Sequence, residues 1–200
     1  MKRFLIVCGV ILFIFAGVLF SQKYKSVAVI TDTLGESTTV TEVKARYKWE
    51  ANLIDPNRRD AFRESICVLL NFQEGRIKTT EKIEIFFHQV KRIDMEYQLK
   101  NKRFPGWLEK LQITKRDGSM VILKTKYPPG YKGNPSSYFE ERSSKGEQTK
   151  AFGVKYFTFS FEKYHSLKSF EGKAKTRSGK VGDYYIPFKE IKSIVFTYSK

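Results

Sequence analysis

The stretch YYIPFKEIKSIVFTY, residues 184–198, repeats the apolar pattern of KIEIFFHQVKRIDMEY, residues 82–97. When Ile85 is aligned with Ile186, the two stretches match without gaps, and the matched positions include Phe87 with Phe188, Val90 with Ile191 and Ile93 with Ile194. The copies share their apolar residues, and a regular apolar spacing indicates the side of an element that is buried. The repeated pattern therefore predicts an architectural unit that occurs twice.

Three further blocks recur in the same order in both halves of the chain. They are FQEGRIKT (72–79) with FEGKAKT (170–176), ITDTLG (30–35) with ITKRDG (113–118), and KARY (44–47) with KTKY (124–127). A shared order of short matches indicates an internal duplication. We expect one β unit over 26–100, a joint with a Pro-Gly turn over 101–107, and a second β unit over 108–200.

The predicted fold class is mainly β, with two related antiparallel units that form either small barrels or one pseudo-symmetric sandwich. The 17 Phe and 11 Tyr residues favour sheet over helix. In each copy a strand leads through a Gly turn to a second strand. Each copy then closes as strand, short turn, strand, because Phe188, Ile191 and Ile194 have the spacing of a single helical turn. A longer helix over 188–198 fits less well, since β-branched and aromatic residues cluster there.

Two segments of the second unit carry opposite signals. Residues 128–150 are rich in Pro, Gly, Ser and charge, which predicts a long mobile loop. Directly after it, Phe157, Phe159 and Phe161 alternate with smaller or more polar residues, which predicts a single strand.

The pattern KRDG (115–118) followed by YYIPFKEIKSIVF (184–196) resembles the KDG…IPFxxIxxI ending of many small exported bacterial β-domains. The resemblance covers only strand starts and ends. It implies an all-β fold and brings no activity with it.

The first 22 residues have the form of a secretory signal. Lys2 and Arg3 precede an uncharged apolar run over 4–20, which is also at the lower limit for a membrane-spanning helix. A cleaved signal and an uncleaved anchor both fit, and in either case we expect the body to be exported, to the periplasm or extracellular side. Cys8 lies too early in the run, after the bulky Val7, for lipid attachment.

The body remains strongly basic without this leader. Removing Lys2 and Arg3 from the 37 cations leaves 35 against 21 acids, a net charge of +14. Such an excess favours anionic partners. Cys67 is the one cysteine after the leader, so an intrachain disulfide is excluded there, and we expect Cys67 to be buried in a strand.

The sequence contains no catalytic or metal-binding pattern that we would assign, and we expect no cofactor. There are two histidines: His88 is expected to be solvated in a turn, and His165 lies close in sequence to Glu162, which is a weak basis for acid–base chemistry. Neither has a partner at metal-ligand spacing. We therefore predict a non-catalytic protein, and a hydrolase using His165 is the less favoured alternative.

Cations alternate with apolar residues in VKARYKW and LKTKY, so a strand places them on one face. Such rows are often only solubilising, and the alternative is a polyanion-binding face. The candidate residues for that face are Lys44, Arg46, Lys48, Lys124, Lys126, Lys173, Lys175, Arg177 and Lys180.

The expected partners are an anionic lipid, an anionic envelope polymer or an envelope protein. Nucleic acid is disfavoured, because Tyr47 and Trp49 point away from the cations while nucleic-acid binders combine the two on one surface. The sequence thus predicts a binding or assembly protein of the cell envelope with a basic face. The alternative is a structural β module that recruits a partner strand at a sheet edge.

Overall fold

The computed structural model describes residues 25–49, 59–98, 107–126, 136–162, 164–176 and 178–199. The predicted leader (1–22) and most of the predicted joint (101–106) lie outside these ranges. The described part is mainly β with antiparallel pairing, which confirms the predicted class at that level.

In these described ranges the secondary structure consists of strands and two 3-10 turns. In the first half these are β1 (Lys25–Asp32), β2 (Ser37–Trp49), β3 (Ala61–Arg63), β4 (Ser65–Glu74), β5 (Ile77–Phe86), η1 (Phe87–Gln89) and β6 (Val90–Gln98). In the second half they are β7 (Trp107–Lys115), β8 (Met120–Lys126), β9 (Ser136–Arg142), β10 (Gln148–Val154), β11 (Tyr156–Thr158), β12 (Ser160–Glu162), β13 (His165–Lys175), β14 (Val181–Pro187), η3 (Phe188–Glu190) and β15 (Ile191–Ser199).

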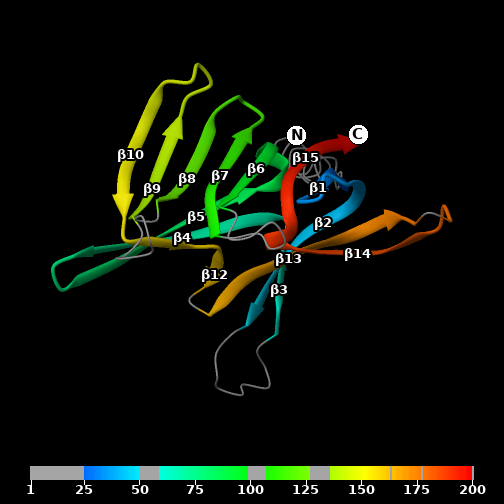
Figure 1. The fold of residues 1–200 in the computed structure, drawn as a ribbon, viewed down its shortest axis with the longest axis horizontal. Coiled ribbons are helices and arrows are strands. Elements are labelled where there is room, and N and C mark those ends of the chain that lie inside the picture. Colours follow the sequence, from blue (N-terminus) through cyan, green and yellow to red (C-terminus); the bar gives the residue numbers. More distant parts are fainter. Residues whose placement is uncertain are drawn as a thin grey trace, which may run out of the picture.

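Strands from both predicted units share one twelve-stranded sheet. Its order is β10-β9-β8-β7-β6-β15-β1-β2-β13-β12, with β14 paired to β13 and β3 paired to β2. A second, three-stranded sheet has the order β11-β4-β5. Figure 1 shows the β4–β5 and β13–β14 hairpins reaching out on opposite sides of the molecule.

The closing strands of the two repeated stretches meet at the centre of the large sheet. β6 pairs with β15 through Ile93 opposite Ile194, and both side chains are fully buried. On its other edge β6 pairs with β7 through Ile93 opposite Ile113. In the same register, β15 pairs with β1 through Ile194 opposite Ile30. The two halves of the sheet are therefore joined along β6 and β15.

The predicted strand, turn and strand are present in both copies. η1 and η3 lie at matching positions, and in each the next residue donates its N–H back into the turn: Val90 to the Phe87 carbonyl and Ile191 to the Phe188 carbonyl. Each turn also contacts a hairpin of the other half. Arg116 N–H donates to the Gln89 carbonyl at 2.8 Å. Thr33 N–H donates to the Glu190 carbonyl at 2.9 Å.

The predicted Gly turn of the first hairpin in each half also forms. Gly35 and Gly118 have φ values of 91° and 85°, a region that side chains with a Cβ rarely adopt. Gly35 N–H donates to the Asp32 carbonyl and Gly118 N–H to the Lys115 carbonyl, both at 3.1 Å. The β1–β2 and β7–β8 hairpins are thus built alike.

One hydrophobic core serves both halves. It takes residues from strands of the large sheet and from β4 and β5 of the small sheet. At its centre the Phe87 ring stacks on Phe196 with centroids 4.8 Å apart and on Phe170 at 5.9 Å. Cys67 is fully buried in β4, as predicted.

Tyr47 joins the two sheets by hydrogen bonds. This fully buried side chain comes from β2, donates its hydroxyl to the Ser65 carbonyl at 3.1 Å, and accepts the Cys67 N–H at 2.8 Å. Burial raises the pKa of Tyr47 far above its ordinary value. The hydroxyl therefore stays neutral and keeps both bonds across the pH range in which proteins fold.

The structure corrects the interpretation of two segments. The loop expected over 128–150 contains β9 and the start of β10. β9 pairs with β8 on one edge and β10 on the other, and this pairing overrides the low strand propensity of its Ser and charged residues. The single strand expected around Phe157–Phe161 is also wrong, since β11 belongs to the small sheet and β12 to the large one. The segment crosses between sheets.

Gly172 provides a test of how closely β13 and β2 approach. A Cβ at this position would lie 2.5 Å from Val40 Cγ1 and 2.6 Å from the Thr41 carbonyl oxygen. We expect Gly172→Ala to lower the free energy of unfolding by about 1–3 kcal/mol, because the β2 backbone has to shift. Urea unfolding followed by circular dichroism measures the change.

Gly182→Ala, in the neighbouring strand β14, is the matched control. Its Cβ would meet Thr176 Cγ2 at 3.6 Å, an ordinary contact. We expect its unfolding midpoint to stay near that of the natural protein. Equal midpoints for both variants would contradict the close approach at Gly172.

Tyr47→Phe tests the link between the sheets. The substitution keeps the ring but leaves the Ser65 carbonyl and the Cys67 N–H without the hydroxyl. We expect a loss of about 1–3 kcal/mol in the free energy of unfolding, since these groups are buried. Tyr138→Phe, on the exposed side of β9, is the control and should change stability little. If the two variants unfold at the same urea concentration, Tyr47 is not a significant link.

Candidate functional site: a basic groove beside an aromatic pocket

The predicted alternation of cations and apolar residues on β2 is present. Val43, Ala45 and Tyr47 are fully buried, whereas the cations between them lie toward solvent. Lys44 and Lys48 are exposed and Arg46 is half-buried. The strand thus turns one face to the core and a cationic face outward.

Arg46 is held in place by two carboxylates. Its Nε donates to Asp60 at 2.8 Å, its Nη2 lies 2.7 Å from the same carboxylate, and its Nη1 donates to Glu171 at 3.1 Å. The hydrogen bonds to Asp60 and Glu171 raise the pKa of Arg46. Burial raises the pKa of Asp60, but the hydrogen bonds from Arg46 and the Trp49 N–H, together with the nearby positive charges, outweigh burial and hold the net pKa below its ordinary value. The positive charge of Arg46 is therefore already paired with two carboxylates of the fold.

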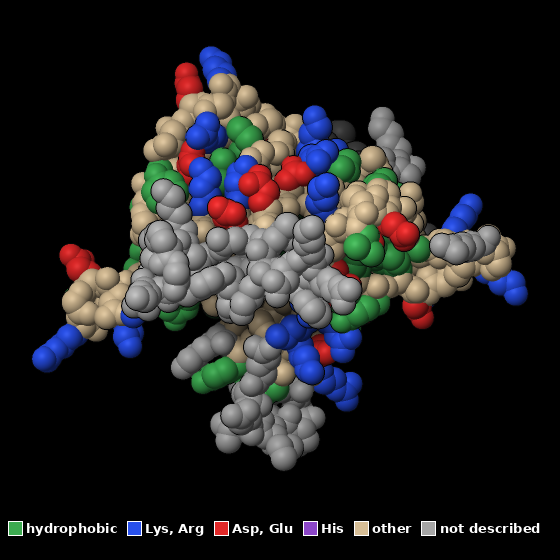
Figure 2. Space-filling view, viewed as in Figure 1, with side chains coloured by type: hydrophobic (Ala, Val, Ile, Leu, Met, Phe, Trp, Pro, Cys, Tyr) green, Lys and Arg blue, Asp and Glu red, His purple; other side chains and the backbone are tan. Residues whose placement is uncertain are grey.

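Next to Arg46 is a hollow that we call the basic groove, with a volume of about 650 Å³. Its charged residues are four cations and one carboxylate: Arg46, Lys48, Lys168, Lys189 and Glu190. Tyr185 and Phe188 also line it. Lys and Arg side chains gather beside β3 and below β13 in Figure 2, in the region where β2 and β13 pair. Since Arg46 already has its own carboxylates, the three lysines give the groove its positive character.

A β-bulge and a 3-10 turn bring Lys168 and Lys189 to the groove. The register between β13 and β2 shifts between Leu167 and Ser169, so Lys168 is the extra residue of a β-bulge. Bulges redirect side chains in this way. Lys189 is the middle residue of η3 and is exposed. Within the described residues, Lys48 and Lys189 make no ion pair within 4 Å.

The other predicted cations lie elsewhere. Lys44 and Lys173 border a second hollow that also contains Glu42, Glu171 and Asp183, so carboxylates outnumber cations there. Lys173 forms an ion pair with Asp183, and its hydrogen bond lowers the pKa of Asp183. Lys175 and Lys180 are exposed near the turn of the β13–β14 hairpin, and Arg177 lies outside the described residues.

The second predicted row is not brought to the first. Lys124 is in β8, and four strands, β7, β6, β15 and β1, separate β8 from β2 in the sheet. Lys124 Nζ lies 3.6 Å from the buried Glu140, which also accepts a 2.5 Å hydrogen bond from Arg142. Lys126 ends the same strand, and only its backbone is described. Lys124 thus offsets a buried carboxylate.

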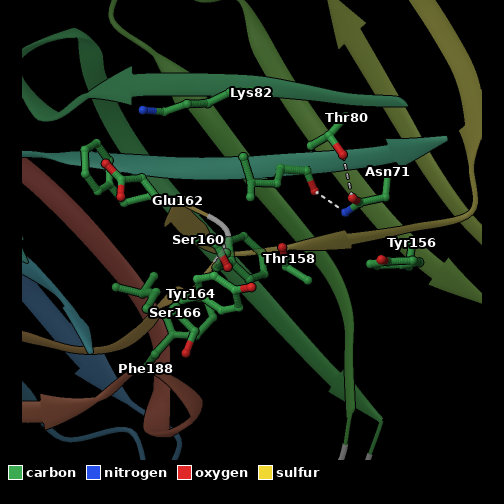
Figure 3. Close-up of a pocket in the computed structure, with 14 residues that line it drawn as sticks. Asn71, Thr80, Lys82, Tyr156, Thr158, Ser160, Glu162, Tyr164, Ser166 and Phe188 are labelled. Carbon is green, nitrogen blue, oxygen red and sulfur yellow. Dashed lines mark hydrogen bonds between the residues drawn. The ribbon is translucent and has the colours of Figure 1, made fainter. Parts of the chain in front are cut away.

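Adjoining the basic groove is a larger hollow, the aromatic pocket, of about 840 Å³ (Figure 3). Its aromatic side chains come mainly from β11, β12 and the turns that follow: Tyr156, Phe159, Phe161, Tyr164 and Phe188. Four residues with hydroxyl side chains also line it: Thr80, Thr158, Ser160 and Ser166. Leu167 and Phe188 border both hollows. The two hollows therefore adjoin each other, and we treat them together as the candidate site.

The histidines have structural surroundings. His88 is exposed in η1, as predicted, and stacks on Phe86 with centroids 5.6 Å apart. His165 is buried, with Nδ1 3.6 Å from Glu162 and Nε2 3.3 Å from the Arg59 carbonyl oxygen. Its ring packs edge-on against Trp49 at 4.9 Å. Both ring nitrogens thus face groups of the fold itself.

Comparison of the chain with protein-family models, curated proteins and solved structures finds no match. Within the described ranges, no three His, Cys, Asp or Glu side chains are grouped so as to hold a metal ion. The same ranges contain no helix that is long and apolar enough to cross a membrane. The geometry of the candidate site is therefore the basis on which a function is proposed below.

Sequence reasoning identified two residues of the groove, Arg46 and Lys48, and missed Lys168 and Lys189. The bulge at Lys168 depends on pairing with a strand more than 100 residues away and leaves no local mark. Lys189 had a weak signal, since it lies at a position of the closing pattern where the repeated copies differ. The aromatic pocket needed the crossing of β11 and β12 between sheets, which the alternating pattern does not contain.

Proposed function

We propose that this chain is a non-catalytic binding protein of the cell envelope whose basic groove engages an anionic polymer or surface. The observation that carries the proposal is the composition of the groove, whose lining holds Lys48, Lys168 and Lys189 with one carboxylate, beside an Arg46 that is paired with two carboxylates of the fold. The net charge of +16 supports it, because solubility does not require one sign of charge.

Binding in such a groove is mainly charge neutralisation. Lysine ammonium groups are flexible point charges and accept anions from many directions, unlike the bidentate fork of arginine. Arg46 contributes a guanidinium group in a fixed position, because Asp60 and Glu171 hold its side chain by hydrogen bonds. Since exposed charges are screened by salt, the affinity should fall steeply as ionic strength rises.

The proposed location rests on the leader. Lys2 and Arg3 before the apolar run over 4–20 support export of the body, with the leader either removed or retained as an anchor. An exported body would meet anionic lipid head groups and envelope polymers. We favour a polymer, because the cations line a hollow and not a flat face.

We further propose that the chain arose by internal duplication, as the repeated sequence blocks predict. The registers of the central sheet support it: exchanging β6 with β15 and β7 with β1 converts the Ile93–Ile113 pair into the Ile194–Ile30 pair. The reciprocal bonds from Thr33 to η3 and from Arg116 to η1 obey the same exchange. The halves differ where β9 occupies the edge of β8, while β2 carries β13 there.

An experimentally determined structure tests the duplication. The rotation that superposes β6 and β7 on β15 and β1 should also superpose η1 on η3. If separate rotations are needed for the strands and for the turns, the repeated pattern reflects convergent apolar spacing.

The groove is tested by comparing two variants that each lose three lysines and therefore have the same net charge. The variant Lys48→Gln/Lys168→Gln/Lys189→Gln is compared with Lys78→Gln/Lys175→Gln/Lys180→Gln, which removes three exposed cations from hairpins outside the groove. Binding of the full chain, in a neutral detergent, to inorganic polyphosphate is measured by calorimetry. At about 0.1 M salt, where the Debye length is about 10 Å, we expect the groove variant to bind about tenfold more weakly.

The control variant should lose no more than about twofold, because its cations lie outside the groove. Equal losses in both variants would show that the overall charge and no particular hollow attracts the polymer. Undiminished binding by the groove variant would also contradict the proposal.

A second candidate function is recruitment of a partner strand at the edge of β5. This ten-residue strand pairs with β4 alone in the described part of the chain, and Ile77 and Phe86 on it are exposed. Charged residues along β5 oppose uncontrolled pairing, so a partner would need complementary charges. A protein that stays bound to the groove variant at high salt would favour this candidate.

A further inference from the structure

The aromatic pocket offers two kinds of surface to a ligand. Tyr156 and Tyr164 are 47% and 44% exposed, and Phe159 and Phe161 are partly buried and pack against the core. Hydroxyl groups of Thr158 and Ser160 alternate with these rings along the segment. Figure 3 shows the polar side chains of Asn71, Thr80 and Lys82 on β4 and β5, across the pocket from Ser160, Ser166 and Tyr164.

The rings are fixed before any ligand arrives. Arg63 Cζ lies 3.3 Å from the centroid of Phe161 and Lys82 Nζ lies 4.2 Å from it. Both cations are also held by Glu84, at 3.6 and 3.5 Å. The Phe159 ring packs on Phe188 with centroids 4.9 Å apart. A preorganised wall of this kind reduces the ordering cost of binding.

The hydroxyl groups argue against an acyl chain as the occupant. Ser166 Oγ is buried and has no hydrogen-bond partner in the part of the chain that the structure describes. Thr80 and Asn71 already bond to each other at 3.0 Å. A hydrocarbon chain would leave Ser166 Oγ unpaired, and a buried polar group without a partner is unfavourable. A sugar ring presents C–H groups to aromatic faces and hydroxyl groups at its edge, so it suits both surfaces.

Consecutive residues join this pocket to the basic groove. Leu167 borders both hollows and is followed by Lys168, while Phe188 borders both and is followed by Lys189. At two places, therefore, the chain sets an apolar side chain against the pocket and a cation in the groove. A single ligand that lies across Leu167 and Phe188 contacts both.

We propose that the ligand is an anionic glycan, with a pyranose ring in the aromatic pocket and its charged group among Lys48, Lys168 and Lys189. This inference rests on the proposed function and names the class of polymer that the groove engages. The aromatic pocket provides selectivity for sugar, and the basic groove provides the attraction to charge. Polyphosphate, which has no ring, engages only the groove.

The test compares two soluble probes on the full chain in neutral detergent: tetragalacturonate, a charged sugar oligomer, and inorganic polyphosphate. Tyr156→Ala removes an exposed ring from the pocket, and Tyr138→Ala, an exposed ring on β9, is the matched control. We expect Tyr156→Ala to weaken tetragalacturonate binding about fivefold or more and to leave polyphosphate binding within about twofold. Tyr138→Ala should change neither.

The outcomes separate the two proposals. If the Lys48/Lys168/Lys189 variant weakens both probes but Tyr156→Ala weakens neither, the groove stands and the glycan inference fails. If the lysine variant weakens neither, the proposed function fails. Dodecyl phosphate is the third probe, and competition by it for the Tyr156-dependent site would overturn the glycan in favour of an acyl ligand. Ser166→Ala, which removes one hydroxyl, should weaken tetragalacturonate and not dodecyl phosphate.

Discussion

The pairing of Ile93 with Ile194 is the contact on which the rest of the sheet depends. Both side chains are fully buried, and their strands, β6 and β15, each use the remaining edge to bind a strand from the start of a half, β7 or β1. Because every strand further out is added to these four, loss of the central register would move apolar side chains to the wrong face. The close match between the stretches at 82–97 and 184–198 follows from this requirement.

The candidate site lies where the two halves of the sheet cease to be alike. On one side β13 covers the edge of β2, with the bulge at Lys168; on the other β9 covers β8, and Lys124 offsets the buried Glu140. β4 and β5 form their own sheet against the core, held to β2 by Tyr47. The aromatic pocket occupies the space between this small sheet and β12–β13. The candidate site thus lies where β13 and the small sheet distinguish one half of the large sheet from the other.

Charge alone is a poor guide to the site on so basic a chain. Arg46, Lys124 and Lys173 each have a carboxylate within reach and act within the fold. In each pair the carboxylate offsets the positive charge of its partner. The three lysines of the basic groove differ from these cations because they gather in one hollow beside aromatic rings. Position relative to other groups, and not the count of lysines, distinguishes them.

By itself the sequence determined the β class, the closing strand-turn-strand of each copy, the Gly turns at Gly35 and Gly118, and the outward face of Lys44, Arg46 and Lys48. These features depend on local periodicity and turn chemistry, which a short window of residues contains. Only the tertiary structure decided that β9 is a paired strand, that the segment from Tyr156 to Glu162 changes sheets, and that Lys168 and Lys189 meet Arg46 and Lys48. Those features depend on pairing between residues far apart in the chain, because a register shift or an occupied sheet edge is set by the partner strand and leaves no periodic trace of its own.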